Sequence, residues 1–302
     1  MNLVQRTVFV SSWKNRLIRG IDWQFSITSL NQKFFYSTKQ KKRKTESLSS
    51  YRASLENDYY TFLKHIHEKE NIFAPGQLVI NLGSSPGIWN NVASEYIGSE
   101  GRVVSVDIIP SRSPANCSMI QGNFLSMAIQ DEIVKAGLRA RRLQEALVQY
   151  GDPSSIPYLQ LALEHEETAE KQESLLKELC ADVIISDLNR PFPMVQGFEF
   201  SISKRPYMAM RNRELLTVKD HLDSLFLAQS SLVFALRGLK QSGTFLCKVV
   251  NGPNLPTLLE DLTMCFSKVN KHVIKGVSGN DNSVVYLCKG KRSTPPITLL
   301  NV

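Results

Sequence analysis

Residues 77–108, QLVINLGSSPGIWNNVASEYIGSEGRVVSVDI, decide the fold of this 302-residue chain. An apolar run at 78–80 leads into a loop of small residues at 83–87, and a helix-compatible stretch follows. A second apolar run at 103–106 ends on Asp107. This order predicts a β-strand, a glycine loop, an α-helix and a parallel β-strand with an acid at its tip.

A ligand of such a unit lies beyond the carboxyl ends of its strands. Gly83 and Gly87 let a ligand approach the backbone, and the start of the next helix offers free N–H groups. The loop matches neither G-x-G-x-x-G nor the G-K-[ST] phosphate loop. On glycine spacing alone, an ordinary α/β turn is the simpler interpretation. The spacing from Gly83 to Asp107, whose carboxylate suits a ribose diol, instead favours an adenosine-type ligand without pyrophosphate, with S-adenosylmethionine as the leading candidate.

The same residues resemble a known family. LGSSPGIW at 82–89, followed by GRVVSVDI at 101–108, is similar to the first two motifs of the FtsJ-like ribose 2'-O-methyltransferases, D-L-G-x-x-P-G-G-W and G-x-V-x-x-x-D. The resemblance continues in order through IQGNF at 120–124, VIISDL at 183–188, GTFLCK at 243–248 and VYL at 285–287. It spans about residues 62–289, with one insertion.

The resemblance implies an α/β, Rossmann-like methyltransferase fold, with a mostly parallel sheet, a closing antiparallel strand and a helical-hairpin insertion. It implies S-adenosylmethionine as the cofactor. The residues it implies for the cofactor pocket are Gly83, Ser84, Pro86, Gly87, Trp89, Asp107, Asn123 and Asp187. The chain departs from the family at Asn81 and Asn123, where the family has Asp, and at Ile88, where it has a second Gly.

For catalysis, the resemblance implies a Lys-Asp-Lys-Glu tetrad that positions and deprotonates a ribose 2'-hydroxyl. Asp187 matches the tetrad Asp, and Lys248 matches the second Lys, which acts as the base. The first Lys falls at Phe62 and the Glu falls at Val284. Lys64 lies two residues from Phe62, nearly on the opposite face of a helix, so it is a poor substitute. Asp281 could serve only if the chain bends inward there.

Two hypotheses therefore remain open. In the first, the chain is a mitochondrial rRNA 2'-O-ribose methyltransferase. In the second, it is a catalytically inactive relative that binds rRNA or assists assembly of the mitochondrial ribosome. Lys248, Asp187 and the loop favour the first hypothesis, whereas Phe62 and Val284 favour the second.

The positive charge of the chain lies at its start. The first 50 residues hold ten Lys/Arg and two acids, and the rest of the chain is balanced. Residues 1–37 mix Arg and Lys with apolar and hydroxyl side chains and contain one acid, which is typical of a mitochondrial transit peptide. A basic linker at 38–58 contains KQKKRK at 39–44, which can contact RNA phosphates, act as a nuclear signal or simply be solvated, and the nuclear signal fits least after a transit peptide. The methyltransferase domain is expected at 59–302, in the mitochondrial matrix.

The domain contains one insertion relative to the family, at 126–180. Two helical patterns, 129–150 and 158–179, flank Gly151-Asp152-Pro153 and predict a helical hairpin. Its simpler interpretation is a solvated insertion, and the sharper one is a docking arm for ribosomal proteins. The expected substrate partner is ribosomal RNA, specifically the mitochondrial large-subunit rRNA.

Helices are also expected at 59–70, 220–239 and 255–266, and strands at 244–250, 269–273 and 284–288. The five cysteines form no C-x-x-C pair, so they are expected to be reduced and mostly buried, without a metal site. No apolar run approaches the length of a membrane span.

Overall fold

The computed structural model describes residues 48–111, 113–150, 179–189, 192–193, 210–211, 217–274 and 283–292. The chain divides into two compact units, residues 1–54 with 296–302 and residues 55–295. The second unit contains the whole of the central sheet.

The sheet has seven strands, in the spatial order β3 (Cys117–Gln121), β2 (Arg102–Asp107), β1 (Leu78–Leu82), β4 (Ala181–Ser186), β7 (Leu239–Val250), β9 (Ser283–Lys291) and β8 (Phe266–Val273). The first five strands are parallel, and β9 runs antiparallel to both of its neighbours. The strand order reverses between β1 and β4, which is where ligands bind in open α/β sheets. The predicted Rossmann-like sheet with its antiparallel closing hairpin is confirmed.

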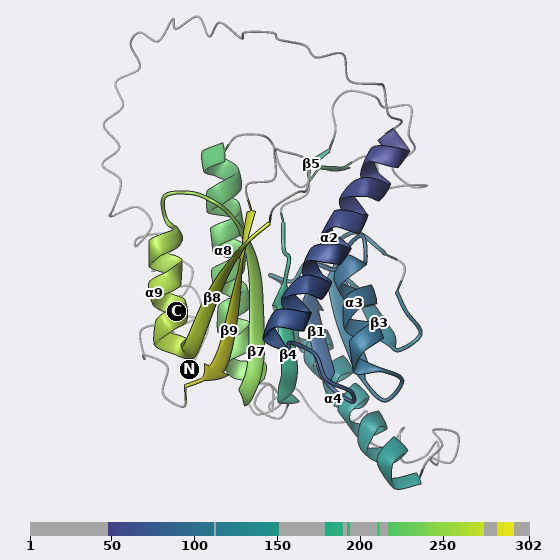
Figure 1. Cartoon of the computed structure of the whole chain (residues 1–302). Coiled ribbons are helices and arrows are strands. Elements are labelled where there is room, and N and C mark those ends of the chain that lie inside the picture. Colours follow the sequence, from purple (N-terminus) through teal and green to yellow (C-terminus); the bar gives the residue numbers. More distant parts are fainter. Residues whose placement is uncertain are drawn as a thin grey trace, which may run out of the picture. The chain divides into compact units, whose positions relative to one another are not determined.

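Helices cover both faces of the sheet (Figure 1). α2 (Leu48–Glu70) and α3 (Ile88–Ile97) pack on one face, where Leu63 and Ile66 join the sheet residues Ile185 and Leu246 in one buried cluster. α4 (Met127–Tyr150) packs on β1 and β2, α8 (Thr217–Gly238) on β4 and β7, and α9 (Leu255–Cys265) on β8. Side chains alternate between the faces of a strand, so the near-continuous burial of β1 and β4 follows from helices on both sides.

The structure differs from the sequence prediction in three places. α2 begins at Leu48, so its first turns occupy part of the predicted linker. β7 begins at Leu239, directly after α8. β5 (Phe192–Pro193) and β6 (Met210–Arg211) form a short antiparallel ladder that was not predicted. The helical pattern at 158–179 lies, apart from Leu179, outside the described residues.

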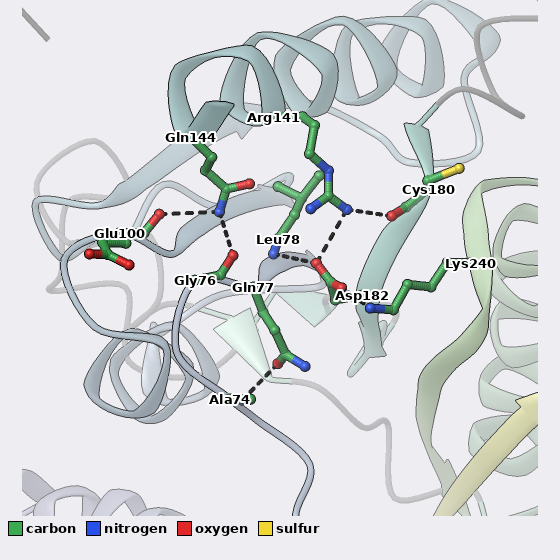
Figure 2. Close-up of polar contacts among 10 residues, drawn as sticks. All are labelled: Ala74, Gly76, Gln77, Leu78, Glu100, Arg141, Gln144, Cys180, Asp182 and Lys240. Atoms are coloured by element: carbon green, nitrogen blue, oxygen red, sulfur yellow. Dashed lines mark hydrogen bonds and ion pairs between the residues drawn. The ribbon is translucent and has the colours of Figure 1, made fainter. Parts of the chain in front are cut away.

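One buried carboxylate joins four elements at the amino ends of the strands (Figure 2). Asp182, 6% exposed, accepts a hydrogen bond of 2.8 Å from the backbone N–H of Leu78 on β1. It also pairs with Arg141 of α4, at 3.2 Å, and with Lys240 of β7. A buried carboxylate is tolerated when donors surround it. Asp182 therefore links β4 to β1, β7 and α4.

The side-chain amide of Gln144 attaches α4 to the sheet at the same amino ends of the strands (Figure 2). Gln144 donates from Nε2 to the backbone oxygens of Gly76, at 3.0 Å, and Glu100, at 3.2 Å. These two carbonyls belong to the turns that precede β1 and β2. The helix is thereby fixed to the sheet as far as about its fifth turn from Met127.

The C-terminal end of α2 is fastened to β8 through Glu70, a nearly buried carboxylate. Asn270 Nδ2 donates to Glu70 Oε1 at 2.8 Å, and Lys268 Nζ lies 3.3 Å from Oε2. Burial alone would raise the pKa of Glu70, but these hydrogen bonds outweigh it and hold the pKa below its ordinary value. These contacts tie the C-terminal end of α2 to β8.

Candidate active site at the carboxyl ends of the strands

The loop after β1 packs directly on the end of β4. Gly83 has a φ of +84°, and a Cβ built there would lie 2.7 Å from backbone atoms of Asp187 and Leu188. Its N–H donates to the carbonyl of Val106 at 2.9 Å, while the N–H of Asp187 donates to Leu82 at 2.8 Å. Only glycine satisfies both the positive φ and the close backbone approach.

Asp187 lies at the centre of the polar contacts beyond the strand ends. Trp89 Nε1 donates to its Oδ2 at 2.8 Å. Asn189 Nδ2 donates to its Oδ1 at 3.1 Å and to its backbone oxygen at 2.9 Å. Because these donors engage both carboxylate oxygens, the orientation of the Asp187 side chain is fixed before any ligand arrives.

The predicted pair of Lys248 and Asp187 is brought together. β4 and β7 are parallel neighbours with Ser186 opposite Cys247, so the next residue of each strand lies at the same level. Lys248 Nζ lies 3.0 Å from Asp187 Oδ1, and their side chains are only 10% and 15% exposed. An ion pair so poorly hydrated at a strand end is typical of a functional site.

Asp107 ends β2, and Asn123 follows the end of the neighbouring strand β3, where the N–H of Gly122 donates to the Asp107 carbonyl at 2.9 Å. Asp107 Oδ2 accepts the N–H of Ser85 at 2.8 Å, and its Oδ1 accepts the N–H of Ile109 at 2.9 Å. Burial raises the pKa of Asp107, although these backbone hydrogen bonds oppose the rise. Asn123 is exposed, and its side chain accepts the N–H of Leu125 at 3.1 Å.

These residues fit a nucleoside ligand. Each oxygen of Asp107 accepts one backbone N–H and keeps capacity for a further donor, as a ribose diol requires. Ser84 Oγ is buried and has no hydrogen-bond partner among the described residues. Pro86, which follows a cis peptide bond, and Gly87 lead into α3, whose first N–H groups face the loop.

Two departures from the family pattern have structural roles. Asn81 is fully buried on β1, and its Nδ2 donates to Asn90 Oδ1 of α3 at 2.7 Å. Ile88 begins α3 and packs against the buried cluster beneath that helix. The hydrogen bond between these two side-chain amides thus holds the end of β1 to α3, next to the glycine loop.

The other two tetrad positions contribute no polar group. Phe62 packs against the buried cluster between α2 and the sheet. Val284 is 2% exposed and pairs with Val249, so it faces the opposite side of the sheet from Lys248. Lys64 pairs with Glu95 of α3 at 2.7 Å, which directs it away from Lys248. Asp281 lies outside the described residues.

Two neighbours of the ion pair were not anticipated from the sequence. The ring of Tyr59, on α2, lies with its centroid 4.5 Å from Lys248 Nζ. Asn189, two residues beyond Asp187, folds back on the carboxylate. Tyr59 fitted the apolar stripe of its helix, so no sequence signal separated it from a core residue. A polar side chain just after a strand-end acid was a usable signal for Asn189.

Among the described residues, no group of His, Cys, Asp and Glu side chains could hold a metal ion. None of the helices in the described ranges is long and apolar enough to cross a membrane. All five cysteines are free, and Cys247, Cys265 and Cys288 are buried, which agrees with the predicted burial of most of the thiols.

Sheet order, switch point and loop together define a Rossmann-like methyltransferase fold. Residues 63–292 match the family of FtsJ-like methyltransferases. The chain is 48% identical, over 89% of both chains, to a Schizosaccharomyces pombe protein provisionally named a ribosomal RNA methyltransferase. It is 27% identical to the mitochondrial rRNA methyltransferase 2 of Saccharomyces cerevisiae, over 69% of this chain and 72% of that one. It is 26% identical to the ribosomal RNA large subunit methyltransferase E of Cellvibrio japonicus, over 68% of this chain and 70% of that one.

The chain belongs to the FtsJ-like methyltransferase family. S-adenosylmethionine is accordingly its cofactor.

Proposed function

We propose that this chain is a mitochondrial rRNA 2'-O-ribose methyltransferase, acting on the large-subunit rRNA in the matrix. One observation carries the proposal: Lys248 and Asp187 form a shielded ion pair at the ends of adjacent strands, directly beside the glycine loop. Relatives named as ribosomal RNA methyltransferases, one of them mitochondrial, support rRNA as the substrate class.

S-adenosylmethionine supplies an activated methyl group, so the protein has to position the acceptor and remove its proton. Gly83, Ser84, Pro86, Gly87, Trp89, Asp107, Asn123 and Asp187 are the residues proposed to hold the cofactor. In its amine form, Lys248 accepts the proton of the 2'-hydroxyl at Nζ. Asp187 then stabilises the resulting ammonium ion across 3.0 Å. Trp89 and Asn189 keep that carboxylate in place.

Residues 1–37 are proposed to be a transit peptide and 38–58 a basic segment that precedes the domain at 59–302. Part of that segment is helical from Leu48. The insertion at 126–180 is proposed to contact ribosomal proteins. A reporter fused to residues 1–45 is expected to enter mitochondria, and a cytosolic reporter would contradict the localisation.

The experiment is methyl transfer from labelled S-adenosylmethionine to ribosomes of cells that lack this protein. A ribose 2'-O-methyl group makes the adjoining phosphodiester resistant to alkali, so the label should appear in alkali-resistant dinucleotides. Label in mononucleotides would indicate base methylation and refute the ribose assignment. The Lys248→Ala variant is expected to lose about 10²- to 10⁴-fold in kcat, the usual contribution of a general base. Its affinity for S-adenosylmethionine should stay within a few-fold.

A second function is favoured by Phe62 and Val284, which leave the tetrad half filled. The chain would then be an inactive FtsJ-like protein that binds rRNA or assists ribosome assembly. Calorimetry of the purified chain with S-adenosylmethionine separates the two at the first step. Absence of binding at high micromolar cofactor, together with normal ribosome assembly in the Lys248→Ala variant, would support this second function.

A further inference from the structure

The amine of Lys248 has two neighbours of different chemistry. Asp187 Oδ1 lies 3.0 Å away, and the centroid of the Tyr59 ring lies 4.5 Å away. A cation within about 6 Å of an aromatic centroid is attracted by the negative face of the ring. Since the Lys248 side chain is only 10% exposed, the carboxylate and the ring replace most of the water that would otherwise surround the amine.

Helix geometry explains why the ring lies there. Leu63 and Ile66 are 1% and 0% exposed and fix the inner face of α2 against the sheet. Tyr59 lies four residues before Leu63, on the same face and one turn closer to the helix start. Tyr60 is turned aside instead, with its hydroxyl on Glu95 and its ring 4.7 Å from Lys64 Nζ. Adjacent tyrosines of α2 therefore face two different lysines.

An aromatic face suits a lysine that exchanges a proton. It attracts the ammonium form, but it contributes neither a donor nor an acceptor that competes for the amine lone pair. A further carboxylate at that place would accept one of the amine hydrogens and draw Nζ away from the substrate. The ring therefore limits the motion of the amine without competing for the lone pair that accepts the proton of the 2'-hydroxyl.

We propose that Tyr59 is a positioning residue that holds the Lys248 amine through its ring face, together with Asp187. The inference rests on the proposed methyl transfer. It adds a residue that the tetrad pattern does not contain, in a chain where Phe62 packs against the buried cluster and Val284 is buried.

The test compares Tyr59→Phe, which keeps the ring face, with Tyr59→Leu, which removes it at similar volume. Tyr60→Leu is the matched control, because it makes the same change on the same helix beside Lys64. Methyl transfer to ribosomes of cells lacking the protein gives kcat and the KM for S-adenosylmethionine. Tyr59→Leu should lower kcat by about tenfold, as expected for loss of a cation–π contact, with KM unchanged. Tyr59→Phe and Tyr60→Leu should keep kcat within about twofold of the unchanged protein.

A second readout needs no activity. N-acetoxysuccinimide acetylates accessible amines, and peptide mass spectrometry reports the rate at Lys248. Tyr59→Leu should raise that rate several-fold, and Tyr59→Phe should leave it unchanged. Equal kcat and equal acetylation rates in Tyr59→Leu and the unchanged protein would overturn the inference, as would a Tyr59→Phe variant as impaired as Tyr59→Leu. If the unchanged protein transfers no methyl group, the proposed function fails and the catalytic role of Tyr59 fails with it. The acetylation rates then still decide whether the ring holds the amine.

Discussion

Replacing Gly83 with alanine should destabilise the protein far more than a loop substitution usually does. The new Cβ would lie 2.7 Å from the carbonyl group of Asp187 and from the N of Leu188, atoms that are backbone and cannot rotate away. Hydrogen bonds to Val106 and Leu82 hold both segments in place. A positive φ costs a non-glycine residue roughly 1–2 kcal/mol, and overpacking costs about 1–3 kcal/mol more. The expected loss in the free energy of unfolding is therefore about 2–5 kcal/mol.

Gly76→Ala is the matched control. Gly76 has a similar φ of +74°, but a Cβ there would meet no atom within 4 Å. This variant incurs only the conformational cost, so the difference between the two variants isolates the contact with Asp187. Urea unfolding followed by circular dichroism gives both free energies by linear extrapolation. A calorimetric titration with S-adenosylmethionine then reports whether separating the loop from β4 weakens cofactor binding, as expected.

Equal losses for Gly83→Ala and Gly76→Ala would refute the reasoning, because the close backbone approach would then cost nothing. If Gly83→Ala shows the whole expected loss of stability but binds the cofactor with unchanged affinity, only the expectation of weaker cofactor binding would be refuted. The loop would then be a packing element, and the cofactor would have to bind elsewhere.

Three further outcomes are expected. Asp182→Ala should lower the free energy of unfolding in urea by about 2–3 kcal/mol, since the buried N–H of Leu78 loses its acceptor while Arg141 and Lys240 still reach water. The control Lys240→Ala should lower it by under about 1 kcal/mol. Equal losses in the two variants would contradict the role of Asp182. Glu70→Gln should cost about 1–2 kcal/mol at pH 7. The pKa of Glu70 is lowered in the fold, so its contribution to stability is present above the ordinary pKa and is lost as the pH falls through the lowered one. The gap between the two proteins should therefore narrow as the pH falls below the ordinary pKa, and a gap independent of pH would refute the assignment. A thiol reagent should modify the exposed Cys180 in the native protein but react with Cys247 only after unfolding. Burial shields the Cys247 thiol and raises its pKa to about 12, so prompt reaction of Cys247 in the native protein would contradict its burial.

The sequence predicted the parts of the site that are set by strand ends. The resemblance to the family's motifs singled out Asp187 and Lys248, and the parallel pairing of β4 with β7 places them at the same level, as expected for neighbouring strands. The loop of Gly83 and the acid Asp107 were found because βαβ geometry is local in the chain.

The remaining features depended on register and on helix orientation, which the sequence pattern does not fix. A shift of one residue in an antiparallel pair moves a side chain to the other face, and this is why Val284 points away from Lys248. Tyr59 and Tyr60 are neighbouring residues of the same type, yet they contact different lysines because only one face of α2 packs on the sheet. The start of α2 was placed too late, since its first turns carry little apolar periodicity.

The Asp182 network has a consequence for how this chain can change over evolutionary time. α4 ends, and the chain enters β4, at the amino ends of the strands, whereas Lys248 lies near their carboxyl ends. Strands of five or six residues separate the two edges by roughly 17–20 Å. Because Arg141 and Gln144 fasten the helix before that exit, sequence inserted beyond it can lengthen, shorten or acquire a binding partner without moving the reacting groups. Sequence changes at the amino ends of the strands can therefore be selected independently of changes at the carboxyl ends.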